Sequence, residues 1–119
     1  MISFFKKIST VVLEGTKTET RRDWGGNSHF EGQKRALDEH LFVRVWCGVK
    51  GNLIGYIQYL SFTRQRLGDM TQDDVVREGG GAMTVDDFRK ANFPGVSDEK
   101  ILLVVRFIFF PLHQQEVGA

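Results

Sequence analysis

The sequence has little cysteine and no long apolar run. Cys47 is its only cysteine, which excludes an intramolecular disulfide and a zinc site built from several cysteines. No run approaches the roughly 18 apolar residues that a membrane span needs, and the first fifteen residues lack the long apolar region and small-residue cleavage site of a secretion signal. We therefore expect a cytoplasmic protein without membrane contact, in which Cys47 is buried in the apolar run FVRVWCG and unreactive.

Net charge is also nearly absent. Sixteen Lys and Arg stand against fifteen Asp and Glu, a balance of +1, so bulk electrostatics favours no class of partner. The distribution is uneven, because residues 1–50 carry a net +3 and residues 51–119 a net −2, which permits one basic face. The three histidines lie too far from other ligand types to predict a metal site, and no cofactor is expected.

The chain is long enough for one domain and too short for two. We expect a single domain over residues 1–112 and a loose tail over 113–119. In the first third, the pattern predicts these segments in order: a β-prone stretch at 2–5, a short helix at 6–14 that ends on Gly15, a strand at 18–22, a loop at 23–33 and about two helical turns at 34–40.

The remainder reads as strands and capped helices. Residues 41–47 and 53–62 are rich in β-branched and aromatic side chains and flank the turn GVKGN, which predicts a hairpin. The further expectations are these: helices after the N-caps Thr71 and Thr84, a strand over 101–111 buried on both faces and ended by Pro111, and Phe107, Phe109 and Phe110 in the core. The fold class is therefore α+β, a small curved or closed sheet with short helices packed at its ends.

The segment LEGTKTETRRDW, residues 13–24, concentrates charge and hydroxyl groups behind a glycine. A solvent-facing strand explains such a composition on its own, since strands tolerate charge and threonine is β-prone. The spacing Gly15-x-Lys17-x-x-Thr20-x-Arg22 nevertheless resembles the G-x-K-x-x-T-x-R signature of ASCH domains, a PUA-like superfamily.

The similarity extends beyond the signature. The opening ISFF, the segment SHF at 28–30 and MTQDDVVREGG resemble the small bacterial ASCH amidohydrolases that remove the acetyl group from N4-acetylcytidine. This resemblance implies a PUA-like small β-barrel with a cleft between barrel and helices that suits a nucleobase or an RNA segment. It also implies catalytic roles for Lys17, Thr20 and Glu78.

That trio is chemically reasonable for amide hydrolysis. A threonine hydroxyl attacks a carbonyl only when a base takes its proton, and a lysine whose pKa is lowered by desolvation or by a nearby cation is such a base. Arg21 and Arg22 are candidate cations. Glu78 would orient the lysine or pass a proton to the leaving amine, which must leave protonated.

Strand geometry limits the trio. In a straight strand, positions 17 and 20 point to opposite faces because side chains alternate with period two. Lys17 and Thr20 therefore meet only if the backbone turns after Gly15. In a straight strand, Thr20 and Arg22 share one face and Lys17 shares the other with Arg21, an arrangement that suits phosphate contact better.

The sequence also departs from the small amidohydrolases. Arg21 stands where an apolar residue would follow the threonine, and Trp24 with GGN enlarges the next loop. Two functions therefore stay open: an enzyme that hydrolyses the amide of an acylated nucleoside, and a non-catalytic RNA-binding module. The expected substrate- or RNA-binding residues are Gly15, Arg21, Arg22, Trp24 and His29. In the RNA-binding module, Lys17 and the two arginines would contact phosphates, and Trp24 or His29 would stack on a base.

Overall fold

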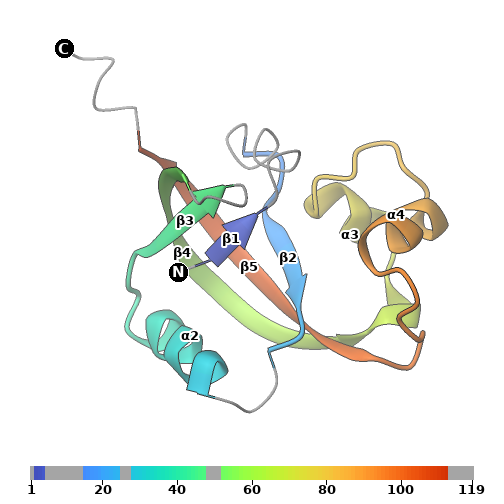
Figure 1. The fold of residues 1–119 in the computed structure, drawn as a ribbon, viewed down its shortest axis with the longest axis horizontal. Helices are drawn as coiled ribbons and strands as arrows, with labels where there is room; N and C mark the ends of the chain where they lie inside the picture. The colour runs from blue at the N-terminus through green and yellow to red at the C-terminus, as the bar shows by residue number, and fades with distance from the viewer. Residues whose placement is uncertain (1, 5–14, 25–27, 48–51, 113–119) are drawn as a thin grey trace.

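The structure is a computed structural model that describes residues 2–4, 15–24, 28–47 and 52–112. Its elements follow in chain order (Figure 1): β1 (Ile2–Phe4), β2 (Glu19–Arg22), α2 (Ser28–Asp38), β3 (Val43–Cys47), β4 (Asn52–Arg66), a 3-10 turn (Leu67–Asp69), α3 (Gln72–Arg77), α4 (Val85–Asn92) and β5 (Ile101–Pro111). No helix in this part of the chain is both long and apolar enough to span a membrane.

The strands form one five-stranded sheet in the order β1-β3-β4-β5-β2. β1 joins β3 in parallel, while β3, β4, β5 and β2 are antiparallel neighbours. This confirms the α+β class. Pairing among the described residues ends at β1 on one side and at β2 on the other, so closure into a barrel is not confirmed.

The main core lies on the face of the sheet that α2 covers. Val45, Ile57 and Val105 have no exposed surface there, and Ala36 of α2 packs against them. A second cluster lies at the opposite end of the molecule, where α3 and α4 pack beside each other (Figure 1). Its members are Leu67, Met70, Val75, Phe88 and Leu102.

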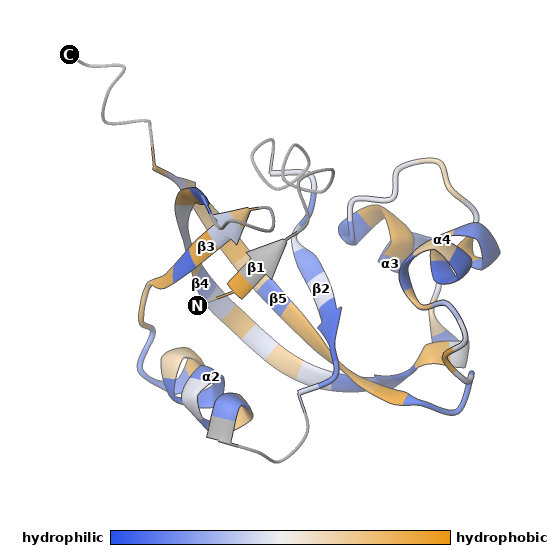
Figure 2. Cartoon of the chain, viewed as in Figure 1, coloured by the Kyte–Doolittle hydropathy of each residue, from blue (hydrophilic) through white to orange (hydrophobic). Residues whose placement is uncertain are grey.

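β5 connects the two clusters, because Leu102 belongs to one and Leu103 to the other. Figure 2 shows hydrophobic residues along much of β5 and hydrophilic ones along β2, its neighbour at the sheet edge. The polar edge strand thus faces the helical end of the molecule, which sets up the candidate site.

Most of the expected elements are confirmed. The hairpin pairs β3 with β4, Thr71 and Thr84 cap α3 and α4 through their side chains, and Cys47 is buried and free. The expected helix at 6–14 and the tail at 113–119 lie outside the described residues, as does most of the hairpin turn. The division into a domain and a tail stays a prediction.

The loop expected at 23–33 is wrong in its second half, because α2 begins at Ser28. Asn, Ser and Gly indicated a loop by composition. However, Phe30 and Leu37 are two turns apart on the same face of the helix, and both pack with Ala36 against the core. This burial outweighs the cost of Gly32 inside a helix, about 1 kcal/mol.

The expectation that β5 is buried on both faces holds only for its first half. Residues 102–105 are buried in succession, since both clusters cover them. Beyond them, Arg106, Ile108 and Phe110 are exposed on one face. The core assignment is therefore right for Phe107, partly right for the half-buried Phe109 and wrong for Phe110.

Candidate functional site

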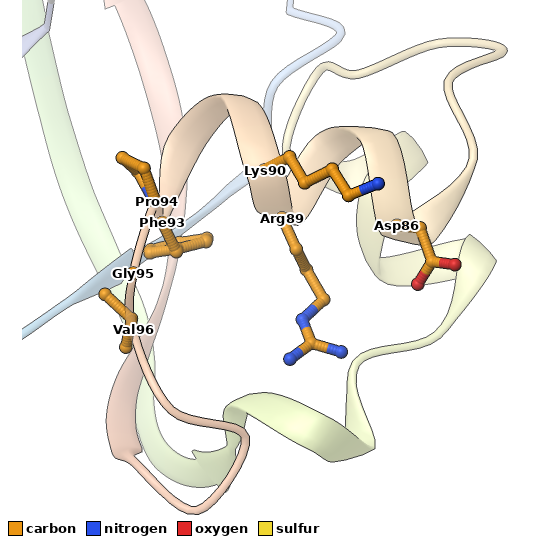
Figure 3. A pocket seen from close by; sticks show the side chains of 7 residues that line it. All are labelled: Asp86, Arg89, Lys90, Phe93, Pro94, Gly95 and Val96. Atoms are coloured by element: carbon orange, nitrogen blue, oxygen red, sulfur yellow. The ribbon is translucent and has the colours of Figure 1, made fainter.

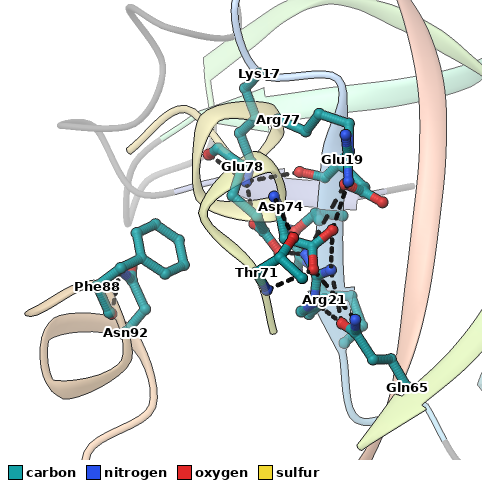
Figure 4. Close-up of polar contacts among 12 residues, drawn as sticks. Lys17, Glu19, Arg21, Gln65, Thr71, Asp74, Arg77, Glu78, Phe88 and Asn92 are labelled. Atoms are coloured by element: carbon teal, nitrogen blue, oxygen red, sulfur yellow. Dashed lines mark hydrogen bonds and ion pairs between the residues drawn. The ribbon is translucent and has the colours of Figure 1, made fainter. Parts of the chain in front are cut away.

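The candidate site lies where β2 meets α3. Figure 4 shows Lys17, Glu19 and Arg21 directed from the β2 segment towards α3. The alternation of strand side chains brings these positions to one side, and all three are buried. A charged face of an edge strand is thus covered by a helix that carries the complementary charges.

Lys17 lies at the centre of this contact. Its Nζ donates to Glu78 Oε1 at 2.7 Å, to the Glu78 carbonyl at 3.0 Å and to the Glu19 carbonyl at 3.0 Å. Burial lowers the pKa of Lys17, and the charges of Arg22 and Arg21 lower that pKa further, while the ion pair with Glu78 opposes them. Lys17 is therefore a buried ammonium whose proton is held less tightly than in water.

Arg21 holds the second oxygen of the same carboxylate. Its NH1 donates to Glu78 Oε2 at 2.8 Å, and its Nε and NH2 both donate to Gln65 Oε1, at 3.0 and 2.8 Å. NH2 also lies 3.2 Å from Asp74 Oδ1. The side chain is only 2% exposed, so the guanidinium is fully engaged inside the protein.

Local sequence signals fix α3 against this cluster. Thr71 begins the helix with a capping box, in which its hydroxyl accepts from Asp74 N and its backbone N–H donates to Asp74 Oδ2 at 2.8 Å. Glu78 is the C-cap. Two carboxylates of the charged cluster therefore mark the ends of the helix: Asp74 in its capping box and Glu78 at its C-cap.

Asp74 illustrates the strength of these contacts. Burial alone would raise the pKa of its carboxyl, but hydrogen bonds from the Thr71 N–H and the Gln65 amide outweigh burial. The cations Arg77 and Arg21 act in the same direction, and the pKa of Asp74 lies well below its usual range. Asp74 is thus a permanently ionised anchor.

Arg77 ties the outer side of the cluster together. Its Nε donates to Glu19 Oε2 at 2.8 Å and its NH2 to Asp74 Oδ1 at 2.6 Å. The Arg77 carbonyl accepts from Thr18 N at 2.8 Å, so main chain as well as side chains joins α3 to the start of β2.

Thr20 and Arg22 face the other side of β2. Thr20 is buried, and its Oγ1 accepts a hydrogen bond from Arg22 Nε at 3.2 Å. Burial lowers the pKa of the Arg22 guanidinium, and the charge of Glu78 raises it. Arg22 therefore connects the Thr20 hydroxyl electrostatically with the Lys17–Glu78 pair.

An aromatic group continues from Arg22. The Arg22 guanidinium lies 5.9 Å from the centroid of Trp24, a cation–π distance. Trp24 in turn contacts His29, Phe62 and Tyr59 edge-on, with centroids 5.1, 6.1 and 6.5 Å apart. His29 is exposed and Trp24 half-buried, so this group has a solvent-facing side.

A groove of about 520 Å³ adjoins the aromatic group. It runs between α2 and β3 and is lined by His29, Gln33, Phe42 and Arg44 among others. Gln33 links the groove to the aromatic group, because its Oε1 accepts from the Tyr59 hydroxyl at 2.5 Å. A volume of this size accommodates a nucleoside-sized ligand.

A different pocket, of about 410 Å³, lies beside α4 (Figure 3). It is lined by residues of α4 and the loop after it, from Asp86 to Val96. None of these residues belongs to the cluster between β2 and α3. Among the described residues, no group of His, Cys, Asp or Glu has the arrangement of a metal site.

The structure brings Lys17 and Glu78 into direct contact, whereas Thr20 lies on β2 and faces the other side. Gly15 has the left-handed φ of +76° that favours glycine, and the strand begins only at Glu19, so Lys17 precedes it. Within β2, Glu19 and Arg21 alternate with Thr20 and Arg22.

Sequence reasoning missed five participants: Glu19, Tyr59, Gln65, Asp74 and Arg77. Only Asp74 had a signal, because Thr-x-x-Asp before an apolar pair is a capping pattern. Long-range partners such as Gln65 become visible only when the sheet is assembled.

Comparison with known proteins identifies the fold. No protein-family model matches the chain, and no curated protein matches it. Among solved structures, a protein from Enterococcus faecalis V583 assigned to DUF984 aligns with a TM-score of 0.65 at 12% identity, over 95% of this chain and 81% of that one. An ASCH domain from Lactobacillus crispatus JV V101 aligns with a TM-score of 0.62 at 15% identity, over 93% and 80% of the two chains.

The chain has the fold of an ASCH domain. A mutant ASCH protein from Zymomonas mobilis aligns as well, with a TM-score of 0.52 at 14% identity, over 98% of this chain and 76% of that one. The resemblance carried by Gly15, Lys17, Thr20 and Arg22 is thus confirmed at the level of the ASCH fold. At these identities the likeness extends to the fold alone.

Proposed function

We propose that this ASCH-fold protein is an amidohydrolase that removes the acyl group from N4-acetylcytidine or a related acylated nucleoside. One observation carries the proposal: a buried lysine of lowered pKa is paired with Glu78 at 2.7 Å and is coupled through Arg22 to the hydroxyl of Thr20. Perturbed titratable groups of this kind concentrate at functional sites.

The protonation states of Lys17 and Glu78 give the two residues separate roles. The Lys17 ammonium donates to three acceptors and has no lone pair, so Lys17 must lose a proton before it accepts one. Glu78 Oε1, which already accepts a hydrogen bond from Lys17 Nζ at 2.7 Å, would take that proton. The neutral amine then takes the proton of an attacking water molecule, or, because Thr20 faces the other side of β2, takes the proton of Thr20 Oγ1 through a bridging water molecule as that oxygen attacks the acyl carbon.

Acyl transfer would proceed in two steps with Thr20 as the nucleophile. The new O–C bond forms, the C–N bond breaks, and the cytosine nitrogen leaves with a proton from Lys17. Water then hydrolyses the threonine ester and releases acetate. If water attacks directly, acetate and cytidine form in one sequence without the ester.

The charge balance of the cluster suits a developing oxyanion. Its four cations are Lys17, Arg21, Arg22 and Arg77, and its three carboxylates are Glu19, Asp74 and Glu78. The surplus positive charge lies beside Thr20 in the form of Arg22, which we assign to the oxyanion. The nucleobase would lie against Trp24 and His29, with the groove beside α2 for the rest of the ligand.

A non-catalytic RNA-binding module is the second candidate. The row formed by Arg22, Trp24 and the exposed His29 favours it, since a cation next to a stacking platform binds single-stranded RNA. Arg21 contributes nothing to it from the interior. Closure of the sheet into a PUA-like barrel also remains a prediction.

Acetate release from N4-acetylcytidine tests the first candidate against the second. The enzyme should convert the free nucleoside at a rate that varies little with salt. An RNA-binding module should leave the nucleoside intact and should lose RNA affinity steeply between 50 and 200 mM salt, by about 10-fold or more if several phosphates are contacted.

A further inference from the structure

Arg21 is buried beside the proposed reacting groups without facing the substrate side of β2. We infer that Arg21 is a positioning residue, which fixes the Glu78 carboxylate in the orientation that presents Oε1 to Lys17. The inference rests on the proposed function for its catalytic consequence. It replaces the role of substrate or RNA contact expected for Arg21 from the sequence.

The carboxylate is held at both oxygens by different residues. Lys17 Nζ occupies Oε1 at 2.7 Å, and Arg21 NH1 occupies Oε2 at 2.8 Å. The terminal torsion of a glutamate is broad when unrestrained, and Glu78 lies at the end of a short helix. Two cations on opposite oxygens remove that freedom.

Arg21 is itself held from two other elements. Gln65 of β4 accepts from Nε and NH2 of the guanidinium through a single oxygen, and Asp74 of α3 lies 3.2 Å from NH2. Gln65 Nε2 also donates to Asp74 Oδ2 at 3.1 Å. The clamp therefore joins β2, β4 and α3 in one rigid polar unit.

The clamp requires the fork of an arginine. A guanidinium has five N–H donors in a fixed plane, and here they reach Glu78, Gln65 and Asp74 at once. A lysine at position 21 would place one compact ammonium among these acceptors. It would keep the charge and lose the geometry.

The clamp also affects the proton affinity of Lys17. Charged groups approach Lys17 from two elements: Glu19, Arg21 and Arg22 from β2, and Asp74, Arg77 and Glu78 from α3 or its cap. Arg21 acts on the pKa of Lys17 in two opposite ways: its charge lowers that pKa, and its hold on Glu78 keeps in place the carboxylate that raises it. A lysine at position 21 keeps the charge and removes the hold, so the midpoint at which Lys17 loses its proton should fall in Arg21→Lys.

Three variants test the inference. Arg21→Met removes charge and clamp, Arg21→Lys keeps the charge, and Gln65→Met removes the support of Arg21 at a half-buried site without deleting any charge. We expect kcat for acetate release to fall about 100-fold in Arg21→Met, as for a misplaced catalytic group, with KM within about twofold. Arg21→Lys and Gln65→Met should fall between that variant and the unaltered protein.

Arg66→Met is the matched control. It deletes two ion pairs outside the cluster, to Asp69 and Glu99, at a side chain that contacts neither Lys17 nor Glu78 among the contacts described. Its kcat should stay within about threefold of the unaltered protein. Equal losses of kcat in Arg66→Met and Arg21→Met would overturn the inference, as would full kcat in Arg21→Met.

A second readout separates this inference from the proposed function. NMR titration of the 13Cε signal of Lys17 follows its proton without any substrate. A Lys17 midpoint that falls in Arg21→Lys, where the charge is kept and the fork is lost, supports the clamp even if the protein releases no acetate, in which case only the amidohydrolase proposal fails. A Lys17 midpoint in Arg21→Lys equal to that of the unaltered protein would overturn the inference even if acetate release is robust.

Discussion

Lys17 Nζ and Glu78 Oε1 lie 2.7 Å apart although 61 positions separate them in the chain. Both side chains are about 95% buried, so the pair exists in a medium where a lone charge is costly. It joins the start of β2 to the end of α3.

Breaking the pair should destabilise the fold as well as the site. Glu78→Gln leaves Lys17 and Arg21 without their common carboxylate, and we expect a loss of about 3–5 kcal/mol in the free energy of unfolding. Adding Lys17→Met should restore part of it, with a coupling energy of about 1–3 kcal/mol in a double-mutant cycle. Urea unfolding measures each variant, and additive effects would show that the two side chains do not interact.

Stability should depend on alkaline pH through Lys17. Because burial lowers its folded pKa below 10.5, the unfolded chain binds more protons than the native state between the folded value and 10.5. The free energy of unfolding therefore gains a positive contribution as pH rises through that window. Urea unfolding from pH 7 to 10 should show it in the unaltered protein and not in Lys17→Met; parallel pH profiles would contradict it.

The two helix caps provide a matched pair of substitutions. Thr71→Ala and Thr84→Ala each remove a hydroxyl that accepts from a helical N–H, so each should cost about 1 kcal/mol of stability. Only α3 carries Asp74 and Glu78. Acetate release should therefore fall in Thr71→Ala and stay unchanged in Thr84→Ala when the two are compared at equal folded fraction. Equal activities of the two variants would show that the site does not depend on the start of α3.

The tryptophans form a second matched pair. Trp24 lies beneath the Arg22 guanidinium, whereas Trp46 pairs with Arg44 on β3. Stacking of a base on an aromatic side chain contributes about 1–3 kcal/mol, so Trp24→Ala should raise KM for N4-acetylcytidine about 5- to 150-fold. Trp46→Ala should leave KM unchanged. A larger effect on KM in Trp46→Ala than in Trp24→Ala would show that the nucleobase does not bind against Trp24.

Patterns local in sequence predicted much of the fold. The hairpin, both capped helices and the strand at β2 follow from side-chain alternation, turn residues and Thr-x-x-Asp caps. α2 was partly missed because its signal is tertiary: Phe30 and Leu37 are stabilised by the sheet they cover. Likewise, only the assembled sheet shows why Phe110 is exposed while Phe107 is buried.

The candidate site was predicted in part. The signature named Lys17, the wider resemblance named Glu78, and the structure places the two side chains in contact. Strand alternation placed Thr20 and Lys17 on opposite faces, and this too is present, with Arg22 as the connection. The interior role of Arg21 could not be predicted, because its partners Gln65 and Asp74 arrive from distant segments.

Acetate release from N4-acetylcytidine by the unaltered protein and by Thr20→Ala tests the central claim most directly. The Thr20 side chain is small, and its hydroxyl accepts from Arg22 Nε, so its removal should cost about 1–3 kcal/mol in the free energy of unfolding and leave the protein folded. We expect steady acetate release by the unaltered protein and a loss of at least about 100-fold in Thr20→Ala. An unaltered protein that leaves the nucleoside intact, or a Thr20→Ala variant as active as its parent, would contradict the account.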